Sequence, residues 1–281
     1  MARRSRCLAT GLGLLMPAAV QAQLPLSIEE LLVEQQVTKL QASARFHHSE
    51  QGAVLQSSHA GGGTLLGTSG VRQRDTTGAL RLRHGIARHL ELHLGATRSR
   101  HSLEGLSGWR GQDTWRVSTG ANWLVSPDNH TPALLLQGSL DIAEQGGMPG
   151  ESSEWGHTAR LGATAYRAID PLVLSMSVQY QHSQSRDTDL GSYRPGAQWA
   201  LNPQVNFAVN YRVTLVGGVT LQHRETGTMD GSDFNPSGYQ TALNLGLGLL
   251  VGRHSTLFAE TRIATSGGEG AALMLDWLYQ F

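Results

Sequence analysis

The sequence predicts an all-β fold: a transmembrane antiparallel up-and-down β-barrel of about 12 strands with a short N-terminal α-helix. Three observations predict it. Apolar and polar residues alternate at the C-terminus, similar alternating stretches fill most of the chain, and short and long connections between them follow a regular rhythm. Successive side chains of a strand point to opposite faces, so each stretch presents one apolar face.

The C-terminal stretch shows the pattern most clearly. Apolar or aromatic residues occupy every second position, at Leu273, Leu275, Trp277, Tyr279 and Phe281. Such a strand fits a soluble sandwich that buries this face, or the closing strand of an outer-membrane barrel that presents it to lipid. The stretch resembles the C-terminal signature of outer-membrane barrels. That resemblance implies that Leu275, Trp277, Tyr279 and Phe281 form the assembly signal for the barrel-assembly machinery.

Twelve alternating stretches can be marked along the chain. They span residues 37–48, 72–84, 88–100, 112–125, 132–144, 156–168, 171–183, 196–209, 212–224, 237–251, 254–266 and 271–281. Pro203 falls within the eighth, where it would remove a ladder hydrogen bond. Either a bulge accommodates it, or that strand is broken and the count is wrong.

The connections after the second stretch alternate in length. The short ones are residues 85–87, 126–131, 169–170 and 210–211, and the long ones are residues 101–111, 145–155, 184–195 and 225–237. An even-stranded barrel with both termini in the periplasm has short periplasmic turns and longer outer loops. A sandwich has no reason to keep this rhythm, so the barrel is favoured.

Residues 1–22 have the composition of a cleaved signal peptide, which predicts export to the outer membrane of a Gram-negative cell. Arg3, Arg4 and Arg6 precede an apolar run, small residues form a cleavage site, and the only cysteine, Cys7, leaves with the peptide. Without these three arginines, the 22 basic residues fall to 19 against 22 acidic ones, a net charge of −3. This balance gives no support for nucleic acid as a partner.

Residues 23–37 are expected to form a domain of their own before the barrel of residues 38–281, with a helix over residues 26–37. Ser27 and Glu30 have the spacing of a capping box at its start. So short a helix is marginal unless it docks on something. It could insert into the lumen as a plug or lie as an anchor on the periplasmic rim. The residues assigned to a plug are Ile28, Glu30, Leu31, Leu32 and Glu34.

Three segments resemble one family of outer-membrane transporters, grouped with the meta-pathway of phenol degradation. Residues 78–99 look like its strand–turn–strand hairpin, with His84 in place of a tyrosine. Residues 111–140 and 165–180 resemble two further hairpin and turn patterns, with Gln112 interposed in the first. The chain is also similar in plan to the barrel that exports functional-amyloid (Fap) subunits, which implies a helix before twelve strands. These motifs report fold rather than substrate.

Charged residues on the polar faces of the strands are the candidate pore lining. They are Arg45, Arg81, Arg83, Glu91, Arg116, Asp141, Arg160, Glu260, Arg262 and Asp276. Such residues could select solutes by charge and size. They could equally form cross-strand pairs that keep a narrow lumen satisfied and rigid.

The histidines do not indicate an enzyme or a metal site. His89 and His93 are four residues apart, which on a strand separates them by about 13 Å, too far to chelate one metal. The His182–Ser183 pair resembles that of barrel phospholipases, but the flanking residues do not match. No catalytic residue and no cofactor is therefore predicted.

The sequence predicts an outer-membrane channel or transporter gated by its N-terminal helix. Outward passage of a small secreted polypeptide and inward diffusion of small molecules both remain open. A non-conducting structural barrel that presents its outer loops is the alternative. The expected partners are outer-membrane lipid and lipopolysaccharide, the barrel-assembly machinery and the transported polypeptide or solute.

Overall fold

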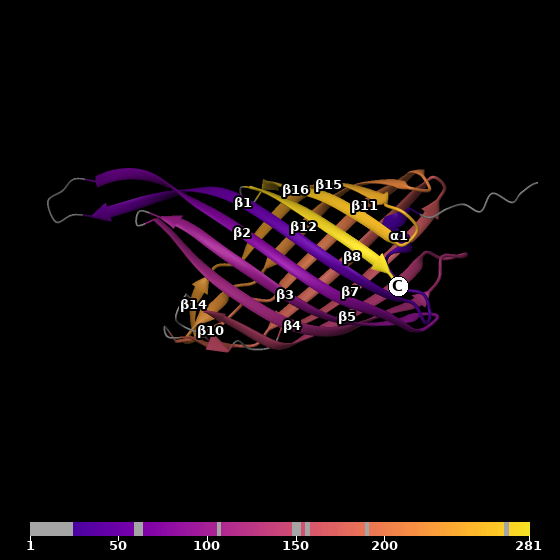
Figure 1. The fold of residues 1–281 in the computed structure, drawn as a ribbon. Coiled ribbons are helices and arrows are strands. Elements are labelled where there is room, and N and C mark those ends of the chain that lie inside the picture. The colour runs from indigo at the N-terminus through magenta and orange to yellow at the C-terminus, as the bar shows by residue number, and fades with distance from the viewer. Residues whose placement is uncertain are drawn as a thin grey trace, which may run out of the picture.

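The structure, a computed structural model, is a closed β-barrel with a short helix at one end (Figure 1). It describes residues 25–58, 64–105, 108–147, 153–154, 158–188, 191–266 and 270–281. The predicted signal peptide, residues 1–22, lies outside the described residues.

Twelve strands form the ring. They are β1 (Thr38–Ser58), β2 (Thr64–Ala87), β3 (Leu90–Gly105), β4 (Gly108–Ser126), β5 (Ala133–Gly147), β7 (Thr158–Ile169), β8 (Leu172–Ser183), β11 (Gln198–Asn210), β12 (Val213–Arg224), β15 (Gly238–Leu250), β16 (Ser255–Ser266) and β17 (Ala271–Gln280). Each pairs antiparallel with its neighbours in the chain, and β17 pairs with β1, which closes the ring. The predicted fold class is therefore confirmed.

The predicted rhythm of connections holds only in part. The long connection predicted at residues 101–111 is wrong, because β3 continues to Gly105, β4 begins at Gly108 and the two strands pair along these ends. The short turns, such as residues 88–89 between β2 and β3, lie at one end of the barrel together with the C-terminus (Figure 1). Two predicted strands, residues 37–48 and 72–84, are much too short, because β1 and β2 continue as a paired hairpin beyond the rest of the wall. Backbone pairing along the whole hairpin extends the strands past the region of clean alternation.

The long connections contain structure that the sequence did not reveal. A small antiparallel sheet joins β9 (Arg186–Thr188), β10 (Gly191–Arg194), β13 (Gly227–Met229) and β14 (Ser232–Asn235), and β6 (Ser153–Glu154) extends from β5. Asp230 ties two of these loops together, since its backbone N–H donates to the carbonyl of Ser192 and its carboxylate accepts from the Ser192 N–H. Short strands of this kind lack a periodic signal.

Pro203 does not break its strand. It lies opposite Met176 in the ladder with β8, and beside it the ladder with β12 is interrupted between Leu201 and Gln204. The register on the two sides of this gap is unchanged, so the missing N–H removes local pairing without a bulge. The count of twelve strands stands.

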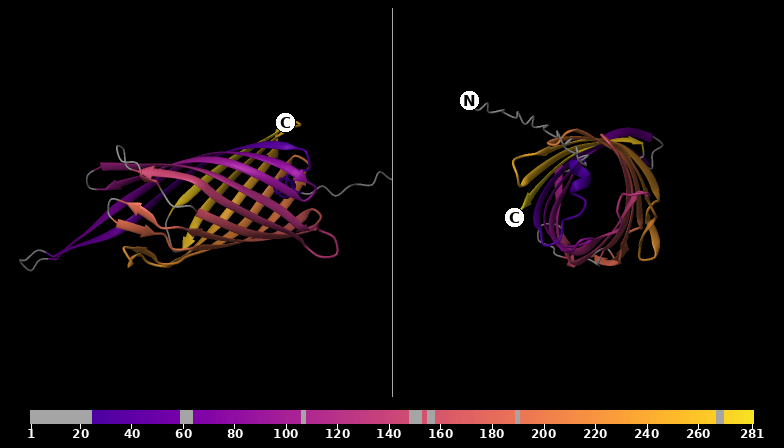
Figure 2. Two further views of the ribbon diagram at one scale, coloured as in Figure 1. Left: turned by 90° about the horizontal axis from the view of Figure 1, so that it is seen from below. Right: turned by 90° about the vertical axis from the view of Figure 1, so that its right-hand side faces the viewer.

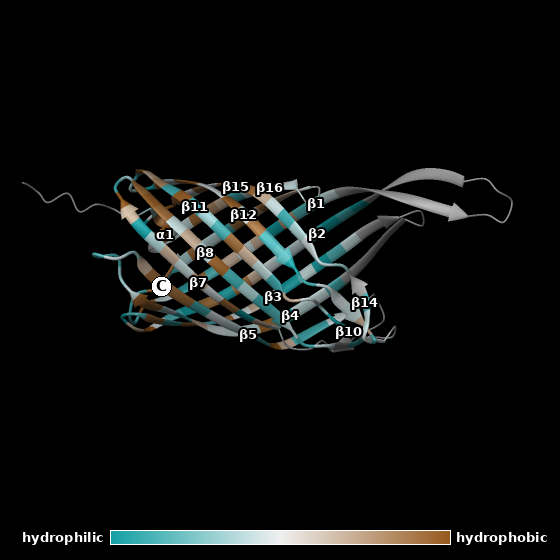
Figure 3. Ribbon diagram, turned by 180° about the vertical axis from the view of Figure 1, so that it is seen from behind, coloured by the Kyte–Doolittle hydropathy of each residue, from teal (hydrophilic) through white to brown (hydrophobic). Residues whose placement is uncertain are grey.

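Hydrophobic and hydrophilic residues alternate along many of the strands (Figure 3), and alternating residues of a strand point to opposite faces of the wall. The outward side chains include Leu80, Leu161 and Leu245, which are 57%, 63% and 53% exposed. Exposed aromatic residues mark both rims, with Trp123 near the short turns and Tyr239 near the long loops. Aromatic residues at both interfaces are typical of membrane barrels.

The N-terminal helix, α1 (Leu26–Glu29), is much shorter than the predicted helix over residues 26–37. Pro25 stands at its N-cap and no side chain caps it, so the predicted capping box is wrong. Contacts with the barrel wall take the place of the helical hydrogen bonds. The backbone N–H of Leu26 donates to Thr214, and the Ser27 hydroxyl donates to Asn206. Among the described residues, no helix is long and apolar enough to cross a membrane.

Candidate functional site

The predicted pore-lining residues all lie on the inward face of the barrel. On β2, Arg81 and Arg83 alternate with the exposed Leu80 and Leu82. Residues that pair across neighbouring strands point to the same face of the sheet, so the inward positions of the other strands follow from the register. The remaining eight inward positions are Arg45, Glu91, Arg116, Asp141, Arg160, Glu260, Arg262 and Asp276.

Side-chain amides are the lumen feature that the sequence reasoning missed. They line the cavities from most of the strands, at Gln41, Asn122, Gln137, Gln179, Gln181, Gln198, Asn202, Gln204, Asn206, Gln222 and Gln240. The signal was present, because Gln179 and Gln181 alternate with the outward Val178 and Tyr180. The amides were missed because only charged residues were considered as pore lining.

Four cavities follow one another through the lumen. The outer cavity, on the side of the long loops, has a volume of about 480 Å³ and the middle cavity about 470 Å³. The inner cavity has about 350 Å³ and the mouth cavity about 200 Å³. Consecutive cavities share lining residues, such as Gln179 between the middle and inner ones and Gln41 between the inner and mouth ones. The lumen is therefore a polar passage.

Residues 25–37, called the docked segment below, lie inside the periplasmic end of this passage (Figure 2). Leu26 and Ile28 are 5% and 6% exposed, and Val33 is fully buried. Of the three apolar residues assigned to a plug, Ile28 is buried, whereas Leu31 and Leu32 are not. Because the helix ends after Glu29, Val33 turns to the wall while Leu31 and Leu32 are half-buried.

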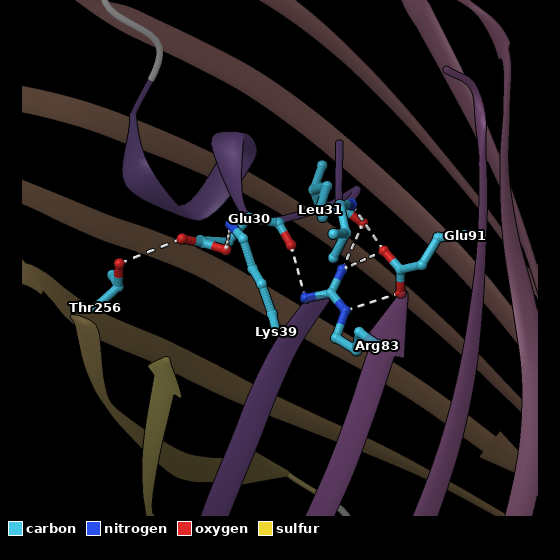
Figure 4. Close-up of polar contacts among 7 residues, drawn as sticks. Glu30, Leu31, Lys39, Arg83, Glu91 and Thr256 are labelled. Atoms are coloured by element: carbon cyan, nitrogen blue, oxygen red, sulfur yellow. Dashed lines mark hydrogen bonds and ion pairs between the residues drawn. The ribbon is translucent and has the colours of Figure 1, made fainter. Parts of the chain in front are cut away.

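A buried ion pair holds the middle of the docked segment (Figure 4). Arg83 and Glu91 form two parallel hydrogen bonds of 2.8 Å, and Glu91 is fully buried. Arg83 also donates to the backbone carbonyls of Glu30 and Leu31 at 3.0 and 3.2 Å. Glu91 accepts from the backbone N–H of Val33 at 2.8 Å. The pair therefore satisfies backbone groups that the helix leaves unpaired.

Glu30 makes the second polar contact. Its carboxylate pairs with Lys39 of β1 at 2.6 Å and accepts from Thr256 of β16 at 3.2 Å (Figure 4). Of the two glutamates assigned to a plug, Glu30 is thus bound by a lysine and Glu34 is exposed, while Arg83 binds the backbone of the segment.

Gly85 of β2 allows the segment to approach the wall closely. Its N–H donates to Val37 and its carbonyl accepts from Gln36. An added Cβ would lie 2.8 Å from the carbonyl oxygen of Val33, and closer still to that of Glu34. Only glycine fits at this crossing.

The lumen charges divide into two groups. Arg83 and Arg160 are held by Glu91 and Asp141, both fully buried. Such pairs mainly keep buried charges satisfied. Arg45 and Arg81 differ, since neither makes a hydrogen bond or an ion pair with the rest of the described chain.

The other charged positions form local contacts. Asp276 accepts from Gln41 at 3.1 Å and from Ser43, and Arg116 lies opposite Glu144. Arg262 and Glu260 approach to 3.9 Å.

The histidine pairs considered from the sequence do not form a site. His182 and Ser183 are consecutive residues of β8 and so point to opposite faces, and Ser183 bonds Thr158 at 3.0 Å. His89 lies in the turn between β2 and β3, while His93 faces the lumen. Within the described ranges, no group of three potential metal ligands is gathered.

The C-terminal residues of the predicted assembly signal face outward from β17. Trp277, Tyr279 and Phe281 stack along the strand, with Phe281 70% exposed. The N–H of Phe281 donates to the carbonyl of Thr38 at 3.1 Å, so the last residue still pairs with β1.

Comparison with known sequences identifies the family. The sequence model of the family described as "Putative MetA-pathway of phenol degradation" matches residues 111–276, which is more than half of the chain. The chain belongs to this family. The family resemblance read from the hairpin motifs is thereby confirmed. No curated protein matches this family member.

Solved structures share the fold of this family member at low identity. An outer membrane channel from Pseudomonas putida F1 aligns with a TM-score of 0.69 and 13% identity, covering 90% of this chain and 98% of that one. The translocator domain of the autotransporter NalP from Neisseria meningitidis aligns at 0.57 and 11%, covering 89% and 90%. The transport unit of the autotransporter AIDA-I from Escherichia coli aligns at 0.56 and 12%, covering 88% and 91%. All three share the barrel fold of this chain.

Proposed function

We propose that the protein is an outer-membrane channel for small polar solutes, held closed by its docked N-terminal segment. The observation that carries this proposal is the placement of residues 25–37. They lie across the periplasmic end of a polar lumen and contact strands on both sides of it, from Asn206 and Thr214 to Glu91. A segment that bridges the lumen blocks it, and its release would open it.

Small solutes fit the lumen better than a polypeptide. The cavities have volumes of about 200 to 480 Å³ and are bounded by ordered side chains. The family description refers to phenol degradation, and a structural neighbour is titled an outer membrane channel, which support passage of small molecules. No catalytic group is needed for this function.

The wider cellular setting follows from the fold and the termini. The outward leucines contact membrane lipid, and we infer that lipopolysaccharide surrounds the end that carries the long loops. Residues 1–22 act as the signal peptide for export in a Gram-negative cell. The C-terminal residues Leu275, Trp277, Tyr279 and Phe281 engage the barrel-assembly machinery.

The Gly85→Ala variant tests the gate. Overpacking at a tight contact costs about 1–3 kcal/mol, which shifts the balance toward the released segment at least about fivefold. Single-channel recording in planar bilayers should show a correspondingly higher open probability. Gly78→Ala is the matched control on the same strand, because an added Cβ there meets nothing within 4 Å. Equal open probabilities for the two variants would exclude this role of Gly85, and absence of current in both would support a purely structural barrel.

A further inference from the structure

The outer and middle cavities meet at four residues on one side of the lumen, called the waist below. Arg45 of β1, Thr220 and Gln222 of β12 and Arg262 of β16 line both cavities. A solute that moves from the long loops toward the docked segment must pass them. The waist therefore decides which solutes reach the inner half of the lumen.

The waist and the outer cavity are positively charged. The outer cavity is lined by four arginines, Arg45, Arg100, Arg224 and Arg262, against one carboxylate, Asp75. That carboxylate is already shared among His47, Gln73 and His101.

The two waist arginines are available to a ligand in different degrees. Arg45 makes no hydrogen bond or ion pair with the rest of the described chain. Arg262 is oriented by a hydrogen bond of 3.1 Å from its Nε to the amide oxygen of Asn244, while Glu260 stays 3.9 Å away. One guanidinium is oriented by a hydrogen bond, and the other interacts with the carboxylates of Asp75 and Glu260 only at longer range.

Deeper in the lumen follows a second arginine that makes no hydrogen bond with the described residues, Arg81, which interacts with Glu91 and Asp276 at longer range. Arg81 lines the inner cavity. Its ladder partner on β1 is Gln41, and Gln41 lies four residues before Arg45 on that strand. Four residues along a strand span about 13 Å. In contrast, the neighbouring Arg83 and Arg160 are neutralised by Glu91 and Asp141. An anion leaving the waist thus meets another cation within a short step.

We propose that the waist binds small organic anions, carboxylates above all, and makes the channel anion-selective. The planar guanidinium fork binds a carboxylate through two parallel hydrogen bonds. From β12, the amide oxygen of Gln222 lines the same passage and can accept from the uncharged part of the solute, while the Thr220 hydroxyl is already bonded to Asn202 and Asn244. The excess of arginines over carboxylates in the outer cavity also concentrates anions there. The inference rests on the proposed channel function.

Reversal potentials of the full-length protein in planar bilayers test the selectivity. With a tenfold gradient of potassium chloride, chloride should permeate at least about three times faster than potassium. Arg45→Gln should bring this ratio close to one, and it removes no contact on which folding depends. The control is Arg98→Gln, which removes the same charge from the outer face, where Arg98 and Asp113 are both exposed.

Block by a carboxylate tests the binding site. Benzoate should reduce the chloride current of the unmodified protein and leave that of Arg45→Gln with Arg262→Gln unchanged, whereas uncharged benzyl alcohol should reduce neither. A chloride preference of one or less, or an equal effect of Arg45→Gln and Arg98→Gln, would overturn the proposal while leaving the channel function intact. Absence of current in every variant would overturn the channel function itself.

Discussion

Deletion of residues 25–36 is expected to raise the single-channel conductance several-fold and to lengthen the open intervals. The deletion removes the buried Leu26, Ile28 and Val33 from the periplasmic end and joins the mouth cavity to the inner one. The barrel itself should assemble normally, because every strand of the ring keeps both of its neighbours. Planar-bilayer recording measures the conductance, and circular dichroism checks that the strand content is kept.

Two point variants test whether the contacts of the docked segment, rather than its presence alone, keep the channel closed. Glu30→Lys places a second ammonium group beside Lys39 and Thr256, so it should raise the open probability. Glu34→Lys makes the same change of charge at an exposed position and should have little effect. If the deletion variant conducts like the full-length chain, the segment is an anchor and not a gate.

Deletion of Phe281 is expected to cut the amount of protein in the outer membrane sharply. The structural loss is small, since Phe281 is 70% exposed and contributes one backbone hydrogen bond to Thr38. Such a bond contributes about 1 kcal/mol, against a typical domain stability of about 5–15 kcal/mol. A large fall in membrane levels would therefore reflect failed recognition by the assembly machinery. Quantitative immunoblotting of outer-membrane fractions gives the result.

Tyr239→Ala is the matched control for the loss of an aromatic residue. Tyr239 is 75% exposed at the opposite rim and lies outside the closing strand. The loss of the Tyr239 side chain should leave the amount of protein in the outer membrane unchanged. Phe281→Tyr, which keeps an aromatic residue at the last position, should give amounts close to those of the unmodified chain. Equal levels for the Phe281 deletion and the unmodified chain would remove the C-terminal residue from the assembly signal.

The barrel could be predicted because its signals are local and repeated. The alternation of Leu80 and Leu82 with Arg81 and Arg83 depends only on the two-residue period of a strand. In strands this regular, the alternation alone separates inward from outward residues. The predicted charged residues therefore all lie in the lumen. The small sheet around Asp230 could not be predicted, because strands of three or four residues are too short to show a period.

The docked segment was mispredicted for a related reason. Its sequence has the local signals of a helix over residues 26–37, yet contacts with residues distant in the chain decide its structure. Ser27 bonds Asn206, 179 positions away, and Val33 bonds Glu91 rather than continuing the helix. Local propensity yields to such tertiary contacts in a short helix. The role of Gly85 was equally hidden, since only the folded chain brings Val33 and Glu34 against it.

A disulfide between the docked segment and the wall tests the gate most directly. The Ser27 hydroxyl and the Asn206 amide oxygen are 2.8 Å apart, and the only natural cysteine, Cys7, lies in the predicted signal peptide. Ser27→Cys with Asn206→Cys, introduced together with Glu30→Lys, should give channels that stay closed when oxidised. Addition of dithiothreitol should restore the openings of the Glu30→Lys variant. Equal conductance before and after reduction, with the disulfide shown to have formed, would contradict gating by this segment.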